Sequence, residues 1–432
     1  MQCTRFTCAV TIVLAWPVAA VAQQGPDIGQ RLMRDTAVLA ALDAIRADEP
    51  RTIEDQVRLC EVPAPPFKEA VRARVYAEAF RAAGLMNVRI DKEGNVLGER
   101  PGVAAPGPSR GATSSSSPPH LVFSAHLDTV FPEETNVKVT RDGSTLRGPG
   151  ISDDCRGLAV VLAVVRALNG ANVRTPGPIT FVGTVGEEGL GDLRGVKALF
   201  GDTLKGRIDR FVSIDGATSA GITHIGVGSR RYRVTFKGPG GHSYGAFGIA
   251  NPVHALGRVI EAISNFEVPS EPKTTFNVGR IGGGTSVNAI ASESWMEVDM
   301  RSADPAALRS LDGRFRQAVA RALAAENARW KNQGRLTVDV ALVGERPAGR
   351  TAAASPIVEA AVSVTRALGI TPMLQEGSTD ANHAMGLSIP AITTGGGGRG
   401  SGGHALDEAW DSTNSWQGSQ RALLLAIALS YP

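Results

Sequence analysis

The sequence predicts an α/β fold, in which a mostly parallel sheet flanked by helices is interrupted by an inserted ferredoxin-like α+β domain. First, short apolar runs alternate with helix-like segments between residues 121 and 214, which is typical of a parallel sheet covered on both faces. Second, polar and apolar residues alternate within the strands after Gly228, which indicates an antiparallel sheet with one wet face. Third, these later segments follow the order β-α-β-β-α-β.

The elements of the predicted parallel sheet follow one another closely. The apolar run at residues 121–125 has the length and composition of a buried strand, and residues 157–168 form an apolar helix that ends at Gly170. The remaining segments are strands at 179–185, 211–214 and 389–393 and a short helix at 192–200. Residues 101–119 are rich in Pro, Gly, Ser and Ala, which indicates a flexible surface insertion.

The inserted domain is expected at residues 228–345, between two parts of the larger catalytic domain at 23–227 and 346–432. Its strands are expected at 231–237, 274–281, 294–300 and 336–340. One helix begins near Pro252. A longer helix follows Asp304, where an Asp-Pro pair supplies a capping carboxylate and then a proline at the first helical position.

The N-terminus and the composition restrict the class of protein. Residues 1–22 contain Arg5, an apolar run and then Ala-Val-Ala, which is the pattern of a cleaved signal peptide. We therefore expect a secreted or periplasmic protein with no membrane segment after cleavage. The 45 Lys and Arg nearly balance the 42 Asp and Glu, so a nucleic-acid partner is not expected and a small molecule or peptide is. Whether Cys60 and Cys155 form a disulfide remains open at this stage.

Acidic residues and histidines follow the predicted parallel strands directly. They are His126 and Asp128, Glu187 and Glu188, Asp215, and His404 in a late glycine-rich loop, while Asp153 and Asp154 open the apolar helix. Because the carboxyl ends of neighbouring parallel strands share one edge of the sheet, these side chains are expected to converge. Two imidazoles with several carboxylates form a ligand set for one or two divalent ions, with zinc the best match. A cation would also offset the repulsion among the carboxylates.

The spacing within two of these clusters suggests separate roles. In a strand-like segment His126 and Asp128 point the same way, so Asp128 can orient the imidazole. Glu187 and Glu188 are adjacent and would point apart in an extended segment. One of them can then bind a metal while the other stays free as a base.

These stretches resemble the co-catalytic zinc metallopeptidases, a family that includes peptidase T, glutamate carboxypeptidase, carnosinase-type dipeptidases, aminoacylase and succinyl-diaminopimelate desuccinylase. The matching stretches occur in family order between residues 124 and 411. They are SAHLDTV, GPGISDDCRG, TVGEEGLGD, SIDG, GPGGHS, TSVNAIA, DMRS and TDANHAMGLSIPAITTGGGGRGSGGHALDEAWD. The resemblance implies hydrolysis of an amide bond in a short peptide or an N-acyl amino acid by a metal-activated water. It implies two divalent ions, most often zinc, with cobalt or manganese as alternatives.

The resemblance also implies a role for each matching residue. It makes His126 a ligand of one ion and His404 a ligand of the other, with Asp153 the bridge between them and Glu188 and Asp215 the remaining terminal ligands. Glu187 becomes the general base and Asp128 the partner of His126. In the inserted domain, which serves as lid and dimerisation domain in many relatives, His242 matches a histidine that reaches a catalytic centre, often that of the neighbouring subunit. Asn288 and Arg301 match substrate-holding positions, and a homodimer is expected.

The acidic motif before the apolar helix departs from the family pattern. Relatives commonly show Asp-x-Lys-Gly where this chain has Asp153-Asp154-Cys155-Arg156-Gly157, with one more residue. Counting forward from Gly148 favours Asp153 as the bridge, whereas counting back from Gly157 favours Asp154. We take Asp153. The last ligand, Asp215, replaces the glutamate of several carboxypeptidase and acylase relatives, which favours a peptidase T-like activity on short peptides.

Other functions are consistent with parts of the sequence. Gly241-His242-Ser243-Tyr244-Gly245 matches G-x-S-x-G, and Ser243, Asp380 and His404 occur in the chain order of a serine-hydrolase triad. That interpretation leaves the other acids unexplained. An N-acyl amino acid amidohydrolase would use the same site as a peptidase. A binding protein without catalysis would have no use for Glu187 beside the ligands.

Overall fold

The computed structural model describes residues 27–103 and 118–432, so the expected signal peptide at 1–22 and most of the expected insertion at 101–119 lie outside the described residues. The strands of its largest sheet are β1 Met86–Ile90, β2 Val96–Arg100, β3 Leu121–His126, β6 Ile179–Thr184, β7 Arg210–Ile214, β8 Gly221–Gly226, β15 Gly349–Arg350, β16 Met373–Gly377 and β17 Ala391–Thr394. Their order is β1-β2-β6-β3-β7-β17-β8-β15, with β16 paired to β8.

The centre of this sheet is parallel, as predicted. Strands β6, β3, β7 and β17 run parallel to one another, whereas β2 joins β6 and β8 joins β17 in antiparallel fashion. All residues of β3, β6 and β17 are buried. Burial on both faces is the reason that these strands appear in the sequence as continuous apolar runs rather than alternating ones.

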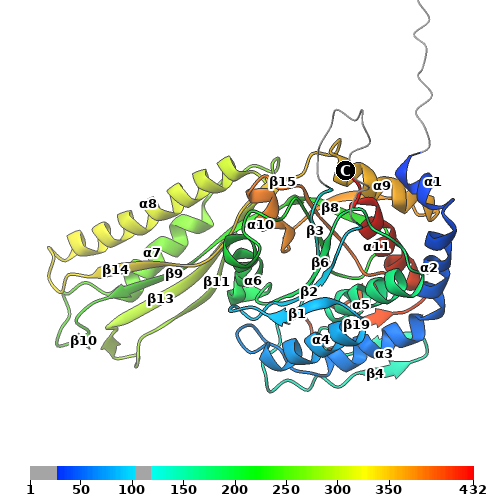
Figure 1. The fold of residues 1–432 in the computed structure, drawn as a ribbon. Coiled ribbons are helices and arrows are strands. Elements are labelled where there is room, and N and C mark those ends of the chain that lie inside the picture. Colours follow the sequence, from blue (N-terminus) through cyan, green and yellow to red (C-terminus); the bar gives the residue numbers. More distant parts are fainter. Residues whose placement is uncertain (1–26, 104–117) are drawn as a thin grey trace, which may run out of the picture.

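Helices cover both faces of the large sheet (Figure 1). They are α1 Ile28–Leu32, α2 Thr36–Ala47, α3 Glu49–Cys60, α4 Ala70–Ala82, α5 Cys155–Gly170, α6 Arg194–Ala198, α9 Pro356–Ala367, α10 Ala381–Gly386 and α11 Trp416–Ala428. Phe123 of β3 belongs to the core beneath α4, α5 and α11, while its neighbour Val122 belongs to the core beneath α6 and α10. Adjacent strand residues point to opposite faces, so both cores hold the same strand in register. Full burial of one such side chain contributes roughly 1.5–3 kcal/mol.

A smaller unit, residues 228–346, forms a second sheet with its own core. Its elements are β9 Gly228–Lys237, β10 Gly241–His242, α7 Pro252–Ser264, β11 Thr274–Gly283, β12 Ala289–Ile290, β13 Glu293–Ser302, α8 Pro305–Arg329 and β14 Thr337–Arg346. The four long strands have the order β11-β13-β9-β14 and are antiparallel, and the short strands β10 and β12 pair separately. The predicted β-α-β-β-α-β order is confirmed. Figure 1 shows this unit extending to one side of the large sheet, with β10 near its far end.

A third, four-stranded sheet brings two distant loops together. Its strands are β4 Thr140–Asp142, β5 Thr145–Arg147, β18 Arg399–Ser401 and β19 Ala409–Asp411, in the order β18-β19-β5-β4. Strand β5 leads into the segment that contains Asp153, and the loop between β18 and β19 contains His404.

Helix α5 is tied to α3 by a disulfide. Cys60, the last residue of α3, pairs with Cys155, the first residue of α5, with their Cα atoms 5.4 Å apart. The pairing that the sequence left open is therefore present. Within the described ranges, no helix has both the length and the apolar character needed to cross a membrane.

Candidate metal centre

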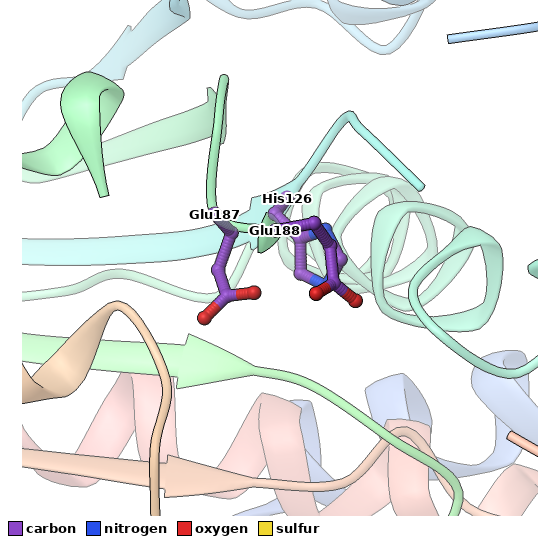
Figure 2. A group of neighbouring side chains, drawn as sticks. All are labelled: His126, Glu187 and Glu188. Atoms are coloured by element: carbon purple, nitrogen blue, oxygen red, sulfur yellow. The ribbon is translucent and has the colours of Figure 1, made fainter. Parts of the chain in front are cut away.

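The predicted ligands converge at the carboxyl edge of the parallel strands. His126 is the last residue of β3, Asp215 directly follows β7, and Glu188 lies in the loop after β6. Three groups of side chains place ligand atoms within 4.8 Å of one another. These groups are His126 with Glu187 and Glu188, His126 with Asp153 and Asp215, and Asp153 with Glu188 and His404. Figure 2 shows the Glu188 carboxyl group beside the His126 ring, with the Glu187 carboxyl group extending to the same side.

Asp153 lies between the two histidines. One carboxylate oxygen, Oδ1, is 2.9 Å from His126 Nε2, and the other, Oδ2, is 3.2 Å from His404 Nε2. His404 Nε2 is also 2.9 Å from Glu188 Oε1. A carboxylate that presents a separate oxygen to each of two imidazoles has the geometry of a bridging ligand.

Asp154 has a different environment from its neighbour. Its Oδ1 accepts a hydrogen bond of 3.0 Å from Gly157 N, which caps the start of α5, and its Oδ2 accepts one of 3.0 Å from His126 N. The side chain is fully buried, and burial raises the pKa of its carboxyl group well above the usual value. Asp154 therefore holds the backbone of β3 and α5 together, while Asp153 faces the histidines.

The Glu187–Glu188 segment differs from the expectation that these side chains point apart. Glu187 N and Glu188 N both donate to Asp128, at 3.0 Å to Oδ1 and 2.8 Å to Oδ2. Consecutive N–H groups of a regular strand point in opposite directions, so the chain departs from regular strand geometry before Glu188, which itself has extended dihedral angles. Gly186, with φ of 65°, makes the turn. Both carboxyl groups consequently reach the same site.

Asp128 contacts His126 through its main chain and through its carboxylate. His126 Nδ1 lies 3.1 Å from the main-chain oxygen of Asp128, whereas the carboxylate Oδ1 is 3.7 Å away. The main-chain oxygen can accept a hydrogen bond from Nδ1–H, which leaves Nε2 of the ring directed at Asp153. The carboxylate of Asp128 mainly fixes the backbone of the Glu187–Glu188 segment.

Arg346 is a residue of the site that the sequence did not reveal. It ends β14 in the smaller unit, and its Nη1 donates to Glu187 Oε1 at 2.8 Å while its Nη2 donates to the Glu187 main-chain oxygen. Both side chains are buried. Because the partners are 159 residues apart, no local pattern could have indicated the pair. Glu187 is therefore held by an arginine of the smaller unit rather than left free.

The protonation equilibria show a surplus of negative charge. Hydrogen bonds to Asp153 and Glu188 raise the pKa of His404 to about 10. Burial raises the pKa of Asp215 to about 7 and that of Glu187 well above its usual value. For His126, burial works against ionisation, but the neighbouring carboxylates of Asp128 and Asp153 outweigh it and raise the pKa. Divalent cations would neutralise this charge, and the mixture of imidazole and carboxylate donors suits zinc.

Two of the other predicted residues, His242 and Asn288, lie away from this cluster. His242 and Asn288 are exposed neighbours near the far end of the smaller unit, where the Asn288 main-chain oxygen accepts from Ser243 N at 2.9 Å. His242 Nδ1 lies 3.2 Å from the N–H groups of Tyr244 and Gly245, so Nε2 is the nitrogen that carries the proton. Arg301 is held by Asp299, with Nε 2.7 Å from Oδ2.

The serine-hydrolase interpretation finds no support in this arrangement. Asp380 accepts a hydrogen bond of 2.5 Å from Thr184 Oγ1 and is fully buried beneath the sheet edge. His404 faces Asp153 and Glu188. The three residues of the supposed triad therefore have other partners, and Ser243 lies in the loop after β10.

Known proteins share this fold and this family. Residues 122–426 match the model of peptidase family M20/M25/M40. The uncharacterized protein YqjE of Bacillus subtilis is 25% identical over 356 residues, which cover 80% of this chain and 90% of that protein. The aminopeptidase PepT of Bacillus cereus is 21% identical with a TM-score of 0.67, covering 88% of this chain and 98% of that one. The YXEP protein of Bacillus subtilis, a dinuclear metal binding peptidase, is 16% identical with a TM-score of 0.62, covering 88% and 99%.

The family match spans the parallel centre of the large sheet and every residue of the ligand cluster. Together with the convergence of imidazoles and carboxylates at one sheet edge, it identifies the chain as a metal-dependent hydrolase that belongs to peptidase family M20/M25/M40.

Proposed function

We propose that the protein is an exported peptidase that hydrolyses an amide bond of short peptides with two divalent ions, most suitably zinc. The observation that carries this proposal is the Asp153 carboxylate, which presents one oxygen to His126 and the other to His404. In this proposal His126 and Asp215 would hold one ion and Glu188 and His404 would hold the other, with Asp153 shared between them. When bound, the ions supply Lewis acidity, which lowers the pKa of water and polarises an amide carbonyl.

The chain's own residues supply the proton transfers. The Glu187 carboxyl group lies within 4.8 Å of ligand atoms of His126 and Glu188, so it can take a proton from water at the site and pass it to the leaving amine. Arg346 and the Asp128 carboxylate hold the side chain and backbone of Glu187. His242, whose Nε2 carries the proton, can donate to the oxygen on which negative charge develops. Asn288 and Arg301 would hold the rest of the substrate.

Two observations support the choice of substrate, and two others support the choice of compartment. Asp215 stands where several acylase and carboxypeptidase relatives have glutamate, and the similar PepT structure is that of an aminopeptidase. The signal-like residues 1–22 agree with the disulfide between Cys60 and Cys155, because such bonds persist in oxidising compartments.

A substrate profile tests the proposal. The purified protein would be stripped with a chelator, reloaded with zinc, cobalt or manganese, and assayed on dipeptides, tripeptides and N-acetyl amino acids. We expect two ions per chain and fastest turnover of a short peptide. Faster turnover of N-acetyl amino acids would identify a deacylase instead, and no turnover of any substrate would indicate a binding protein.

A further inference from the structure

A buried carboxylate joins the two loops that supply the proposed bridging and terminal ligands. Glu408 Oε2 accepts a hydrogen bond of 2.9 Å from Gly150 N. Its Oε1 accepts from Ser152 N at 2.8 Å, from Ser152 Oγ at 2.5 Å and from Asp153 N at 3.2 Å. One side chain therefore collects four donors from the segment that leads to Asp153.

The third sheet explains why these residues meet. Ala409 of β19 pairs with Arg147 of β5, so Glu408 lies beside Gly148, whose N–H donates to the Glu408 main-chain oxygen at 3.0 Å. From that point the side chain extends along residues 150–153. His404 lies four positions before Glu408 in the same loop, where the Glu408 N–H donates to Ala405 O at 3.1 Å. The position of His404 relative to Asp153 thus depends on a short stretch that includes Glu408.

Burial of the Glu408 carboxylate carries a free-energy cost, which would be hard to explain for a residue with no function. The side chain is fully buried, and within the described part of the chain no lysine, arginine or histidine forms an ion pair with it. An uncompensated buried carboxylate costs several kcal/mol unless its hydrogen bonds are well made. It also lies near the carboxylate of Asp153, whose charge disfavours a second anion.

We infer that Glu408 is a positioning residue of the metal centre, which fixes the Asp153 backbone relative to the His404 loop so that both carboxylate oxygens of Asp153 face their histidines. The inference rests on the proposed function, because it assigns Glu408 a role in metal binding at that same site. Residues that orient metal ligands in this way typically change metal affinity by roughly 10- to 100-fold when altered.

The test compares zinc binding by two variants of Glu408, one that changes the length of the side chain and one that changes its charge. Glu408→Asp keeps the charge but shortens the side chain, so it loses contact with the N–H groups of residues 150–153. Glu408→Gln keeps the reach but turns an NH₂ group toward N–H donors. Zinc affinity of the metal-free proteins would be measured by competition with a chelator, and the rise in Tm on zinc loading would be measured in parallel.

We expect both variants to bind zinc roughly 10- to 100-fold more weakly than the wild type and to show a smaller zinc-induced rise in Tm. Ser152→Ala removes only the hydrogen bond to Ser152 Oγ, so it should fold even if the Glu408 variants do not, and a few-fold loss of affinity is expected for it.

The matched control is Glu326→Gln. Glu326 is also fully buried and accepts from Asn251 N, Arg258 and Trp330, but it lies in the smaller unit. The Glu326→Gln variant should lower Tm and leave zinc affinity unchanged.

Two results would overturn the inference. One is unchanged zinc affinity in the Glu408 and Ser152 variants, combined with equal losses of Tm in the metal-free and zinc-loaded forms. A purely structural role of Glu408 would produce this result. The other is a loss in Glu408→Gln but not in Glu408→Asp, which would assign the effect to charge at a distance. The readout does not require turnover. If the wild type binds zinc but cleaves no substrate, the proposed function fails while the affinity comparison still decides the inference.

Discussion

Asp153 and Asp154 show how two adjacent residues of one type acquire different roles. Asp153 is a quarter exposed at its side chain and faces both histidines, whereas Asp154 is fully buried and accepts only backbone N–H groups. Counting positions from the flanking glycines could not distinguish the roles of the two aspartates. Those roles depend on which side chain faces the histidines and which one faces the backbone of β3.

Substituting each aspartate by asparagine should give opposite phenotypes. We expect Asp153→Asn to lose most of its bound metal while remaining folded, because a carboxamide cannot present two anionic oxygens. Asp154→Asn should keep its metal but lose about 1–3 kcal/mol of unfolding free energy, because its amide NH₂ would face an N–H donor. Metal analysis and urea unfolding of both variants check this, and metal loss confined to Asp154→Asn would reverse the assignment.

Asp380 gives the metal-free protein a pH-dependent stability. Burial raises the pKa of this carboxyl group to about 6 from a usual value near 3.8, and its Oδ1 has no hydrogen-bond partner among the described residues. The stabilising contribution is full below the unfolded pKa and is lost as the pH rises through the folded value. Relative to Asp380→Asn, the wild type should therefore become less stable between about pH 4 and 6, by up to about 3 kcal/mol. Urea unfolding in the presence of a chelator measures this, and a pH-independent difference would contradict it.

At the scale of elements, the sequence predicts the buried strands beside the site. It does not predict the edge strands of the sheet or the long-range contacts of the site residues. The segment predicted at 121–125 is β3 at Leu121–His126, and the helix predicted at 157–168 is α5 at Cys155–Gly170, because continuous burial leaves long apolar runs. The antiparallel edge strands were missed, since β1 has no fully buried residue to mark it. The convergence of Glu187 and Glu188 depends on the turn at Gly186, and the contacts of Arg346 and Glu408 bridge long sequence separations.

The disulfide between α3 and α5 should stabilise the folded protein. It links residues 95 positions apart and anchors the first residue of α5 next to Asp154, so it restricts the unfolded chain and the start of that helix. We expect Cys60→Ser/Cys155→Ser to lose about 2–5 kcal/mol of unfolding free energy. Reduction with dithiothreitol should lower the Tm of the wild type and leave the double variant unchanged. Equal responses of the two proteins to dithiothreitol would show that the bond is not formed.

At the scale of the whole molecule, the proposed catalytic residues lie in two distant places. Glu187 and the ligand cluster lie at the edge of the large sheet, while His242 and Asn288 lie near the far end of the smaller unit (Figure 1). Exposed apolar side chains surround them, with Tyr244 at 89% and Val287 at 103% relative exposure. Two arrangements would bring these residues together: a homodimer in which His242 of one subunit completes the site of its partner, and closure of the smaller unit over its own site.

Complementation distinguishes these arrangements. His242→Ala and Glu187→Gln should each be nearly inactive, whereas Ser243→Ala should keep most of its activity. If the site is shared between subunits, co-expressed His242→Ala and Glu187→Gln chains should recover about a quarter of wild-type activity, because half of randomly assembled dimers contain one intact site. Mixed chains with no recovered activity would place His242 and Glu187 in the same subunit's site.

The proposed mechanism depends most on Glu187 acting as a base beside bound metal rather than as a ligand. The most direct measurement is the metal content and the kcat of Glu187→Gln on the best short peptide, alongside the wild type. We predict two ions per chain in both proteins and a kcat lower by roughly 100- to 10,000-fold in the variant. A variant that retains full activity, or a wild type that is active after complete metal removal, would contradict it.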